Sequence, residues 1–311
     1  DDVESRGLGD VYKRQPYTSI EFAKNNPVSL ESGTSHKMQL VTGPANATDH
    51  RIKWTSSNKT AATVDENGTV TALRPIETVT ITAVYKTNPA LICSWNLKIT
   101  RTKGYITKQM LDNLDLTAIK KVMITAHPDD ETLWGGGHLI EGEYLVVCMT
   151  HGWNPKRRTA FEQTMRTTND KYLILDYPDV RKTFSNGKYE TDMLSTCKNA
   201  MQEDINLILS YKKWDLIATH NPFGEYGKFL HKTISQMVTQ CYNKMTNKSA
   251  TLYYFGRYYN SSNKIPGEQI APELLAIKNS MVDRYYPTAK GAIVAFGHMI
   301  PYENWLLPSE W

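Results

Sequence analysis

The residues best suited to chemistry lie together at Ala126–Glu131, where an imidazole is followed by adjacent carboxylates. This segment comes directly after Val122–Ala126, a short, partly β-branched apolar run that predicts a buried strand. Ligands of open α/β sheets bind just beyond the carboxyl ends of the strands. His127 and Asp130 offer the nitrogen and oxygen ligands that zinc accepts, and the neighbouring Asp129 could act as a base for water at the metal.

A hydrolytic zinc site needs a third protein ligand and an open position for water. The loop Thr219–His231 could supply this ligand, because it follows the predicted strand Leu216–Ala218 and leads into a helix with regularly spaced apolar residues. His231 falls in the first turn of that helix, so we expect it to complete the site. His151 and His220 also follow strands and are expected to support the metal ligands or to contact substrate rather than to bind metal, with a purely structural role as the alternative.

The elements that would position these residues alternate between strand and helix from Lys120 onward. Helical spacing of apolar residues predicts helices near 158–171, 190–212 and 229–246. Such alternation is typical of a Rossmann-like α/β fold, in which a parallel sheet carries helices on both faces. Apolar runs predict its strands at Val122–Ala126, Tyr144–Met149, Tyr172–Leu175, Leu216–Ala218 and Ala292–Phe296.

Residues 16–101 have a different pattern, in which short strand-like runs alternate with turn signals. The clearest signal is Asn67-Gly68, which separates two alternating segments and predicts a hairpin. Several short strands in so short a region indicate a small all-β sandwich. Residues 102–118 are expected to form a linker that leads into a short helix. Residues 1–15 are polar, lack the apolar core of a secretory signal, and are interpreted as a non-native or disordered leader.

The composition argues against two kinds of partner. The net charge is +4, from 36 basic and 32 acidic side chains, and no long basic run stands out, so nucleic-acid binding is not expected. No apolar stretch approaches the ~18 residues of a membrane-spanning helix. The four cysteines are widely spaced and form no CxxC pair, which predicts free, buried thiols and no cysteine-ligated zinc.

The N-terminal region resembles the bacterial Ig-like domain, group 2. The resemblance rests on Lys53–Asn58, Ala62–Asp65 and Asn67–Leu73, and it extends over nearly the whole region. It implies a spacer or adhesive module outside a bacterial cell or on its surface, where the domain could contact glycans. No export signal is visible in the chain, so this location is expected from the resemblance alone.

Residues 119–311 resemble the LmbE/PIG-L family of zinc-dependent N-acetylglucosaminyl deacetylases. The family's Ala-His-Pro-Asp-Asp-Glu signature stands at Ala126–Glu131, and its second motif is matched in part by Gly224–Gly227 and His231. Lys228 occupies the place of a histidine that is usual in the family. The resemblance implies that the zinc ligands are His127, Asp130 and His231, and that Asp129 is the general base.

The resemblance also implies roles toward the substrate carbonyl. Tyr226 would hydrogen-bond its oxygen, and the residue at position 228 would stabilise the developing charge or protonate the leaving amine. Lys228 supplies a cation there but is a poorer proton donor than an imidazole unless its pKa is lowered.

Two further substrate contacts are expected with less support. An arginine of this region contacts substrate in the family, which makes Arg158 a candidate, with Arg157 and Arg166 as competitors. His298 lies among aromatic residues that could stack on a sugar, although packing in the core is the alternative.

The leading hypothesis is therefore a Zn²⁺-dependent hydrolase that removes an acetyl group from an N-acetylated amino sugar or its conjugate. A second hypothesis is hydrolysis of another amide at the same metal. A third is a non-catalytic, extracellular carbohydrate-binding or adhesion module with a degenerate deacetylase domain, and Lys228 is the residue that favours it.

Overall fold

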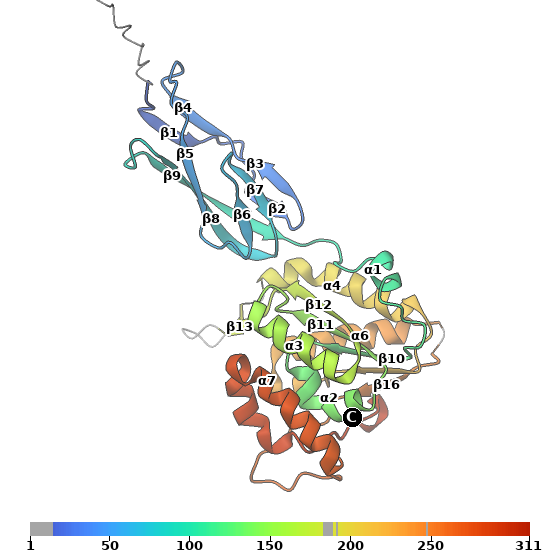
Figure 1. Cartoon of the computed structure of the whole chain (residues 1–311). Coiled ribbons are helices and arrows are strands. Elements are labelled where there is room, and N and C mark those ends of the chain that lie inside the picture. The colour runs from blue at the N-terminus through green and yellow to red at the C-terminus, as the bar shows by residue number, and fades with distance from the viewer. Residues whose placement is uncertain (1–14, 183–188, 191, 247) are drawn as a thin grey trace, which may run out of the picture. The chain divides into compact units, whose positions relative to one another are not determined.

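The computed structural model describes residues 15–182, 189–190, 192–246 and 248–311, which form two compact units (Figure 1). The first unit ends at Thr100 and the second begins at Arg101. The leader expected at residues 1–15 lies, except for Gln15, outside the described residues.

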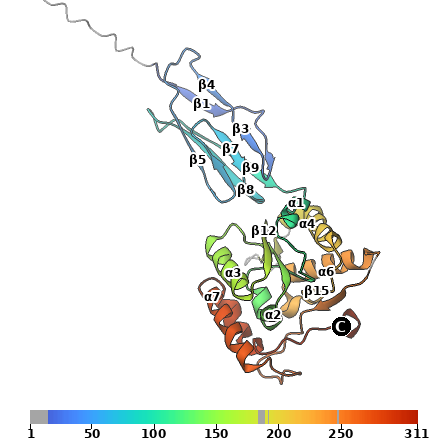
Figure 2. The same ribbon diagram turned by 45° about the vertical axis from the view of Figure 1, so that its right-hand side comes forward.

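The first unit is a β-sandwich with an apolar interior that includes Phe22, Ile81 and Leu97. Its sheets have the strand orders β2-β9-β8-β5, β3-β7-β6 and β1-β4. Figure 2 shows the strands of this unit from a second direction. The strands are β1 (Ser19–Phe22), β2 (Ser29–Glu31), β3 (Ser35–Lys37), β4 (Leu40–Gly43), β5 (Ile52–Ser56), β6 (Ala62–Val64), β7 (Thr69–Ala72), β8 (Ile76–Tyr85) and β9 (Ile92–Thr100).

The predicted hairpin is confirmed between β6 and β7, which pair antiparallel. The Asp65 carboxylate accepts the backbone N–H groups of Asn67 and Thr69, and this fixes the turn. Gly68 has φ +81°, and a Cβ there would lie 2.5 Å from the Trp54 ring, so the turn requires glycine for two separate reasons.

The second unit contains a five-stranded parallel sheet with the order β12-β11-β10-β15-β16. In chain order this is 3-2-1-4-5, the arrangement of doubly wound α/β folds. The strand order reverses between β10 and β15, so a crevice is expected at the carboxyl ends of these two strands. The strands are β10 (Lys121–Thr125), β11 (Tyr144–Thr150), β12 (Lys171–Tyr177), β15 (Leu216–Thr219) and β16 (Thr251–Tyr254).

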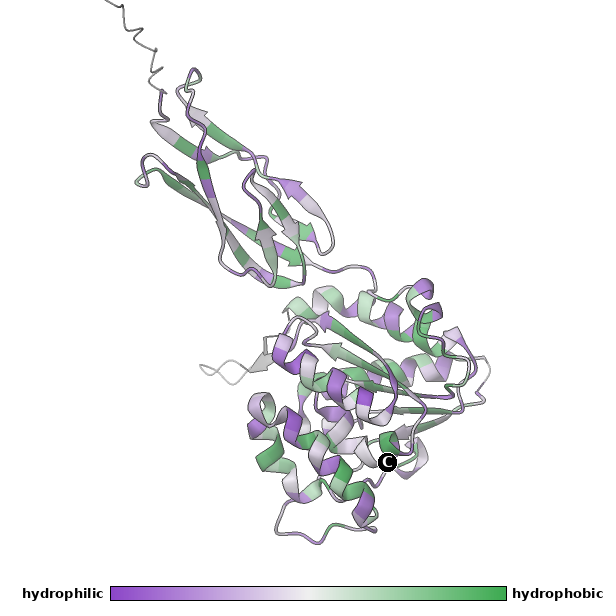
Figure 3. Ribbon diagram, viewed as in Figure 1, coloured by the Kyte–Doolittle hydropathy of each residue, from purple (hydrophilic) through white to green (hydrophobic). Residues whose placement is uncertain are grey.

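Helices cover both faces of this sheet. Successive side chains of a strand point to opposite faces, and because those of β10 are buried in both directions, each face packs against its own set of helices. Val122 and Ile124 of β10 belong to the core packed with α1, α4 and α6, whereas Met123 belongs to the core packed with α2, α3 and α7. Figure 3 shows hydrophobic residues concentrated on the central strands. The helices are α1 (Lys108–Asp112), α2 (Asp130–Ile140), α3 (Pro155–Thr168), α4 (Asp192–Tyr211), α5 (Gly224–Gly227), α6 (Phe229–Lys244) and α7 (Pro272–Phe296).

Most of the predicted elements are confirmed, and the exceptions have a simple cause. The strand predicted at Ala292–Phe296 is wrong, because these residues end helix α7. A short apolar run cannot be distinguished from a buried helical segment by periodicity alone. The fifth strand is instead β16, Thr251–Tyr254, which the sequence did not reveal. All four cysteines are free thiols, as expected. Their predicted burial is confirmed for Cys148, Cys197 and Cys241 but is wrong for Cys93, which is partly exposed.

Candidate metal centre

The first part of the site is built where strand β10 passes into helix α2. His127 follows the strand, and Asp130 is the first residue of the helix. The backbone N–H of His127 donates to Asp130 Oδ2 at 2.7 Å, which folds the carboxylate back toward the imidazole. Asp129, between them, has φ 137° and ψ −30°. Non-glycine residues rarely adopt such a conformation, and strain of this kind is commonly found at functional sites.

The second part is built where strand β15 leads through a tight loop into helix α6. Gly224 has φ +63°, and a Cβ there would lie 2.9 Å from the Lys232 side chain and 3.2 Å from that of His231. The loop therefore needs glycine both for its backbone angle and for space. This close approach places His231 in the first turn of α6, with its side chain fully buried.

The side chains of His127, Asp130 and His231 converge, as the sequence predicted, and their potential ligand atoms all lie within 4.8 Å of one another. His127 Nδ1 lies 3.1 Å from His231 Nε2 and 3.2 Å from Asp130 Oδ2, and the last two atoms are 3.4 Å apart. Two imidazole nitrogens and one carboxylate oxygen are a donor set typical of catalytic zinc. The residues present therefore fit such a metal.

The protonation of these groups follows from their burial and their neighbours. Burial lowers the pKa of His231 to about 4, which leaves its imidazole neutral. Burial opposes protonation of His127 as well, but the carboxylates of Asp179 and Asp130 outweigh it and raise that pKa to about 9. For Asp130, burial is outweighed by the His231 and His220 imidazoles, which hold its pKa well below the usual range. A cation bound here would have to displace the proton from His127.

Asp129 has the protonation behaviour of a proton acceptor that works near neutral pH. Burial, followed by the Asp130 carboxylate, raises the pKa of Asp129 to about 8, whereas Arg157 lowers it. A cation at the three converging atoms would lower this pKa further and favour the free carboxylate. The backbone N–H of Asp129 donates to the Glu131 carboxylate. This buried carboxylate also accepts the Tyr285 hydroxyl at 2.6 Å.

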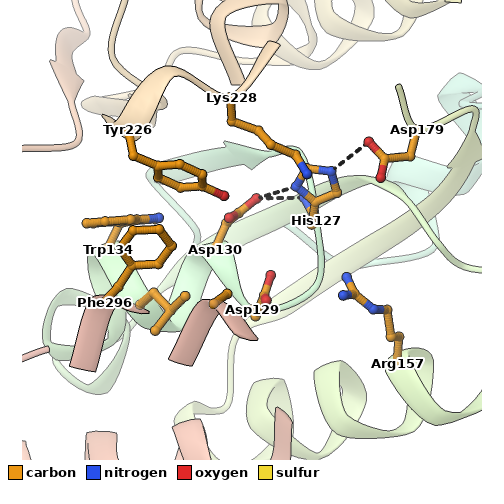
Figure 4. A pocket seen from close by; sticks show the side chains of 11 residues that line it. His127, Asp129, Asp130, Trp134, Arg157, Asp179, Tyr226, Lys228 and Phe296 are labelled. Atoms are coloured by element: carbon orange, nitrogen blue, oxygen red, sulfur yellow. Dashed lines mark hydrogen bonds and ion pairs between the residues drawn. The ribbon is translucent and has the colours of Figure 1, made fainter. Parts of the chain in front are cut away.

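A pocket opens onto this centre (Figure 4). Tyr226 packs on Phe296 with ring centroids 4.3 Å apart and meets the His231 ring edge-on at 5.7 Å. Tyr226 is partly exposed, but desolvation of its hydroxyl in the pocket and the Asp130 carboxylate raise its pKa above the usual range, so the hydroxyl stays a donor. The pocket is lined by His127, Asp129, Asp130, Leu133, Trp134, Arg157, Asp179, Tyr226, Lys228, Ala292 and Phe296.

The pocket is therefore lined by the residues predicted as ligands, base and oxyanion donors, with one exception. His231 is fully buried and does not line it. The predicted substrate contacts are arranged differently. Arg158 does not line it, because its Nε donates to the Gly152 carbonyl at 2.6 Å and its guanidinium faces Glu162. Arg157, one residue earlier and so about 100° around helix α3, takes that place. Arg166 pairs with Glu162 and is also absent from the lining.

None of the three histidines predicted to contact substrate lines the pocket. His220 is fully buried and stacks on His231, with ring centroids 3.9 Å apart. His151 meets the His127 ring edge-on at 5.7 Å and has a positive φ of 67°. His298 lies 2.8 Å from the Tyr259 carbonyl. In the aromatic C-terminal segment, Trp305 is partly buried, packs against the core and stacks on His138 at 3.7 Å, which favours the alternative interpretation.

Asp179 is a charged residue of the pocket that sequence reasoning missed. Its Oδ1 accepts a hydrogen bond from His127 Nε2 at 3.0 Å (Figure 4). Once His127 is neutral, its lone pair is therefore on Nδ1, which faces Asp130 and His231. A signal was available: Asp179 stands two residues after strand β12, at the same sheet edge as His127. The rule that located His127 applies equally to this aspartate.

Comparisons with known sequences identify part of the chain. Residues 16–94 match the family model of the bacterial Ig-like domain (group 2). The chain is 31% identical over 175 residues to the uncharacterized protein L374 of Acanthamoeba polyphaga mimivirus. The match covers 51% of this chain and 67% of that protein, so this chain belongs to the same family as L374. It is 32% identical over 117 residues to the uncharacterized protein CA_P0160 of Clostridium acetobutylicum, covering 37% of this chain but only 12% of that protein.

Among solved structures, the conserved protein TT1542 from Thermus thermophilus aligns with 62% of this chain and 96% of its own, at 12% identity and a TM-score of 0.43. A GH10 xylanase from termite gut that contains a bacterial Ig-like domain aligns with 86% of this chain and 68% of its own, at 16% identity and a TM-score of 0.20. No helix among the described residues has the length and apolar character to cross a membrane.

Proposed function

We propose that this chain is a zinc-dependent hydrolase that removes the acetyl group from an N-acetylated amino sugar of the N-acetylglucosamine type, or from its conjugate. The observation that carries the proposal is the convergence of His127, Asp130 and His231 at the base of a pocket that Asp129 also lines. The resemblance of residues 119–311 to the LmbE/PIG-L deacetylases supports it, because the converging residues are those that this resemblance assigns to zinc and to the base.

His127 Nδ1, Asp130 Oδ2 and His231 Nε2 would hold the metal. Bound zinc supplies a Lewis acid and lowers the pKa of a coordinated water to about 7. Asp129 would accept the proton that the attacking water loses, since it lies in the pocket next to a ligand and its pKa suits exchange near neutral pH.

Two side chains on the other wall would bind the carbonyl oxygen as it gains negative charge. Tyr226 offers a hydroxyl that remains protonated, and Lys228 offers a cation. Both come from the loop and helix start that also position His231, so they are fixed relative to the metal centre. Donors aimed at a developing oxyanion usually contribute the largest single part of such catalysis.

The remaining lining suits a sugar. Arg157 and Asp179 present a donor and an acceptor for hydroxyl groups, while Trp134 and Phe296 present apolar surface. The bacterial Ig-like domain at residues 16–94 suggests that the enzyme works outside the cell or at its surface, where N-acetylated glycans would be its substrates.

The test is zinc content together with acetyl release. Wild-type protein should hold about one zinc per chain, and His231→Ala should hold none. The matched control is His298→Ala, which changes a histidine of the same unit that lies outside the pocket and should keep the zinc. The wild type should release acetate from one or more members of a panel of N-acetylated amino sugars.

Other results would favour the other hypotheses. Zinc binding with cleavage of a different amide would keep the metal centre and replace the substrate. Sugar binding by a protein that cannot be loaded with zinc would favour a non-catalytic binding module, for which Lys228 is the supporting observation.

A further inference from the structure

A second buried group of potential metal ligands lies behind the first and shares one residue with it. It consists of His220, Glu225 and His231, whose side chains are fully buried. Glu225 Oε2 lies 3.0 Å from His220 Nδ1 and 2.5 Å from His231 Nδ1. His220 and Glu225 do not line the pocket, so neither can touch a substrate there.

The protonation of this group follows from one backbone contact. The N–H of Ala126 donates to His220 Nε2 at 2.9 Å, and a backbone N–H can only donate. His220 Nε2 is therefore an acceptor, and the proton of a neutral His220 lies on Nδ1, facing Glu225. A carboxylate oxygen can only accept, so His231 Nδ1 also carries a proton. The lone pair of His231 is then on Nε2, which faces His127 and Asp130.

We propose that His220 and Glu225 are positioning residues that hold His231 in the tautomer and orientation needed to bind a metal, rather than a second metal site or a substrate contact. The inference rests on the metal centre of the proposed function. A further metal between the three residues is disfavoured, because both Nδ1 atoms act as donors to the same carboxylate oxygen.

The same pair connects the two chain segments that carry the ligands. His220 follows β15 and reaches the backbone of Ala126, the residue directly before His127. Glu225 reaches His231 at the start of α6. The distance between the two ligand histidines is therefore set by hydrogen bonds inside the protein before any metal arrives, which reduces the cost of ordering the site.

The loop holds Glu225 in a conformation that it would not adopt without support. Its φ of 54° and ψ of −75° are unfavourable for a residue with a Cβ. Asn221 compensates: its side-chain oxygen accepts the N–H of Glu225 at 3.0 Å, and its backbone N–H donates to Glu225 Oε1 at 3.0 Å. The Asn221 amide is in turn anchored to the carbonyls of Phe255 and Gly256.

The test is the zinc affinity of Glu225→Gln in the full chain, measured by competition with a chromophoric chelator. The amide cannot accept both Nδ1–H groups through one charged oxygen, so zinc should bind about 10- to 100-fold more weakly than in the wild type. Asp204→Asn is the matched control. Asp204 is an equally buried carboxylate that accepts the N–H groups of Tyr105 and Ile106 and lies outside the pocket, so its variant should keep wild-type zinc affinity.

A measurement on the wild type guards against a variant that fails to fold. Long-range ¹H–¹⁵N NMR spectra should show His220 and His231 protonated on Nδ1 in the zinc-loaded protein. Wild-type zinc affinity in folded Glu225→Gln, or an Nε2-protonated His220, would overturn the inference. Either result can occur in an active deacetylase, whereas zinc binding without acetyl release in the wild type overturns only the proposed activity.

Discussion

Both units of this molecule bury an aspartate, but the surroundings of the two carboxylates differ in kind. In the Ig-like unit, the hydrogen-bond partners of Asp49 among the described residues are donors, with Arg51 Nη2 and Thr87 Oγ1 each at 2.7 Å. In the α/β unit, Asp130 Oδ2 accepts the backbone N–H of His127, but it also faces ring nitrogens of His127 and His231 whose other ring nitrogens already donate to carboxylates. Burial alone therefore does not mark a site; acceptors that converge on one point do, because only a cation or a proton satisfies them.

The largest expected effect is on turnover, and it should distinguish Asp129, the proposed base, from Asp49, which has a structural role. Asp129→Asn should retain zinc and lose about 10²- to 10⁴-fold in turnover, because the amide cannot accept the proton. Asp49→Asn, the control in the other unit, should leave turnover unchanged and lower only the stability of the Ig-like unit. Steady-state kinetics and zinc content of both variants check this prediction. Near-normal turnover in Asp129→Asn would refute the proposed base.

The comparison also shows what the sequence could and could not reveal. His127, Asp130 and His231 were predictable because each follows a strand or starts a helix in a recognisable context, and the doubly wound order then brings them to one sheet edge. Which of Arg157 and Arg158 lines the pocket could not be predicted, because that depends on the rotation of α3 about its axis. That rotation is set by packing against α7, with which α3 shares a core.

The strand prediction failed at Ala292–Phe296 for a similar reason. An apolar pentapeptide suits either a strand or the buried side of a helix, and the surrounding tertiary structure decided for the helix. His220 was expected near the site because it follows a strand, but its pairing with Glu225 could not be predicted, because it depends on side-chain hydrogen bonds and on one from the Ala126 backbone. Local pattern predicts which residues reach the site but does not predict which of them face one another.

A smaller effect should come from the cation on the pocket wall. Lys228→Met should lower turnover by about 10²- to 10³-fold, the usual cost of losing one oxyanion-stabilising group, and should leave zinc affinity unchanged. The matched control is Lys232→Met, which removes an exposed lysine one helical turn further along α6 and should have no effect. Full activity of Lys228→Met would show that Tyr226 is sufficient on that wall.

The smallest expected effect is the pH dependence of zinc binding. It tests directly whether the acceptors around Asp130 share a proton in the metal-free protein. The pKa of His127 is raised to about 9, chiefly because Asp179 and Asp130 outweigh the effect of burial, so below pH 9 zinc must displace a proton from this imidazole. His231, with a pKa of about 4, is already neutral in this range. Zinc affinity should therefore rise about tenfold for each pH unit between 6 and 8.

This dependence is best measured in the Asp129→Asn background, because the Asp129 carboxyl itself has a pKa of about 8 and would add its own proton to the exchange. Adding Asp179→Asn should lower the pKa of His127, since it removes the largest contribution that raises it, and should flatten the upper part of the curve. An affinity that does not change between pH 6 and 8 would mean that His127 is already neutral before zinc binds. In that case no proton would lie between His127 and Asp130 in the metal-free protein. The proposed difference between the acceptor-lined Asp130 and the donor-lined Asp49 would then be wrong.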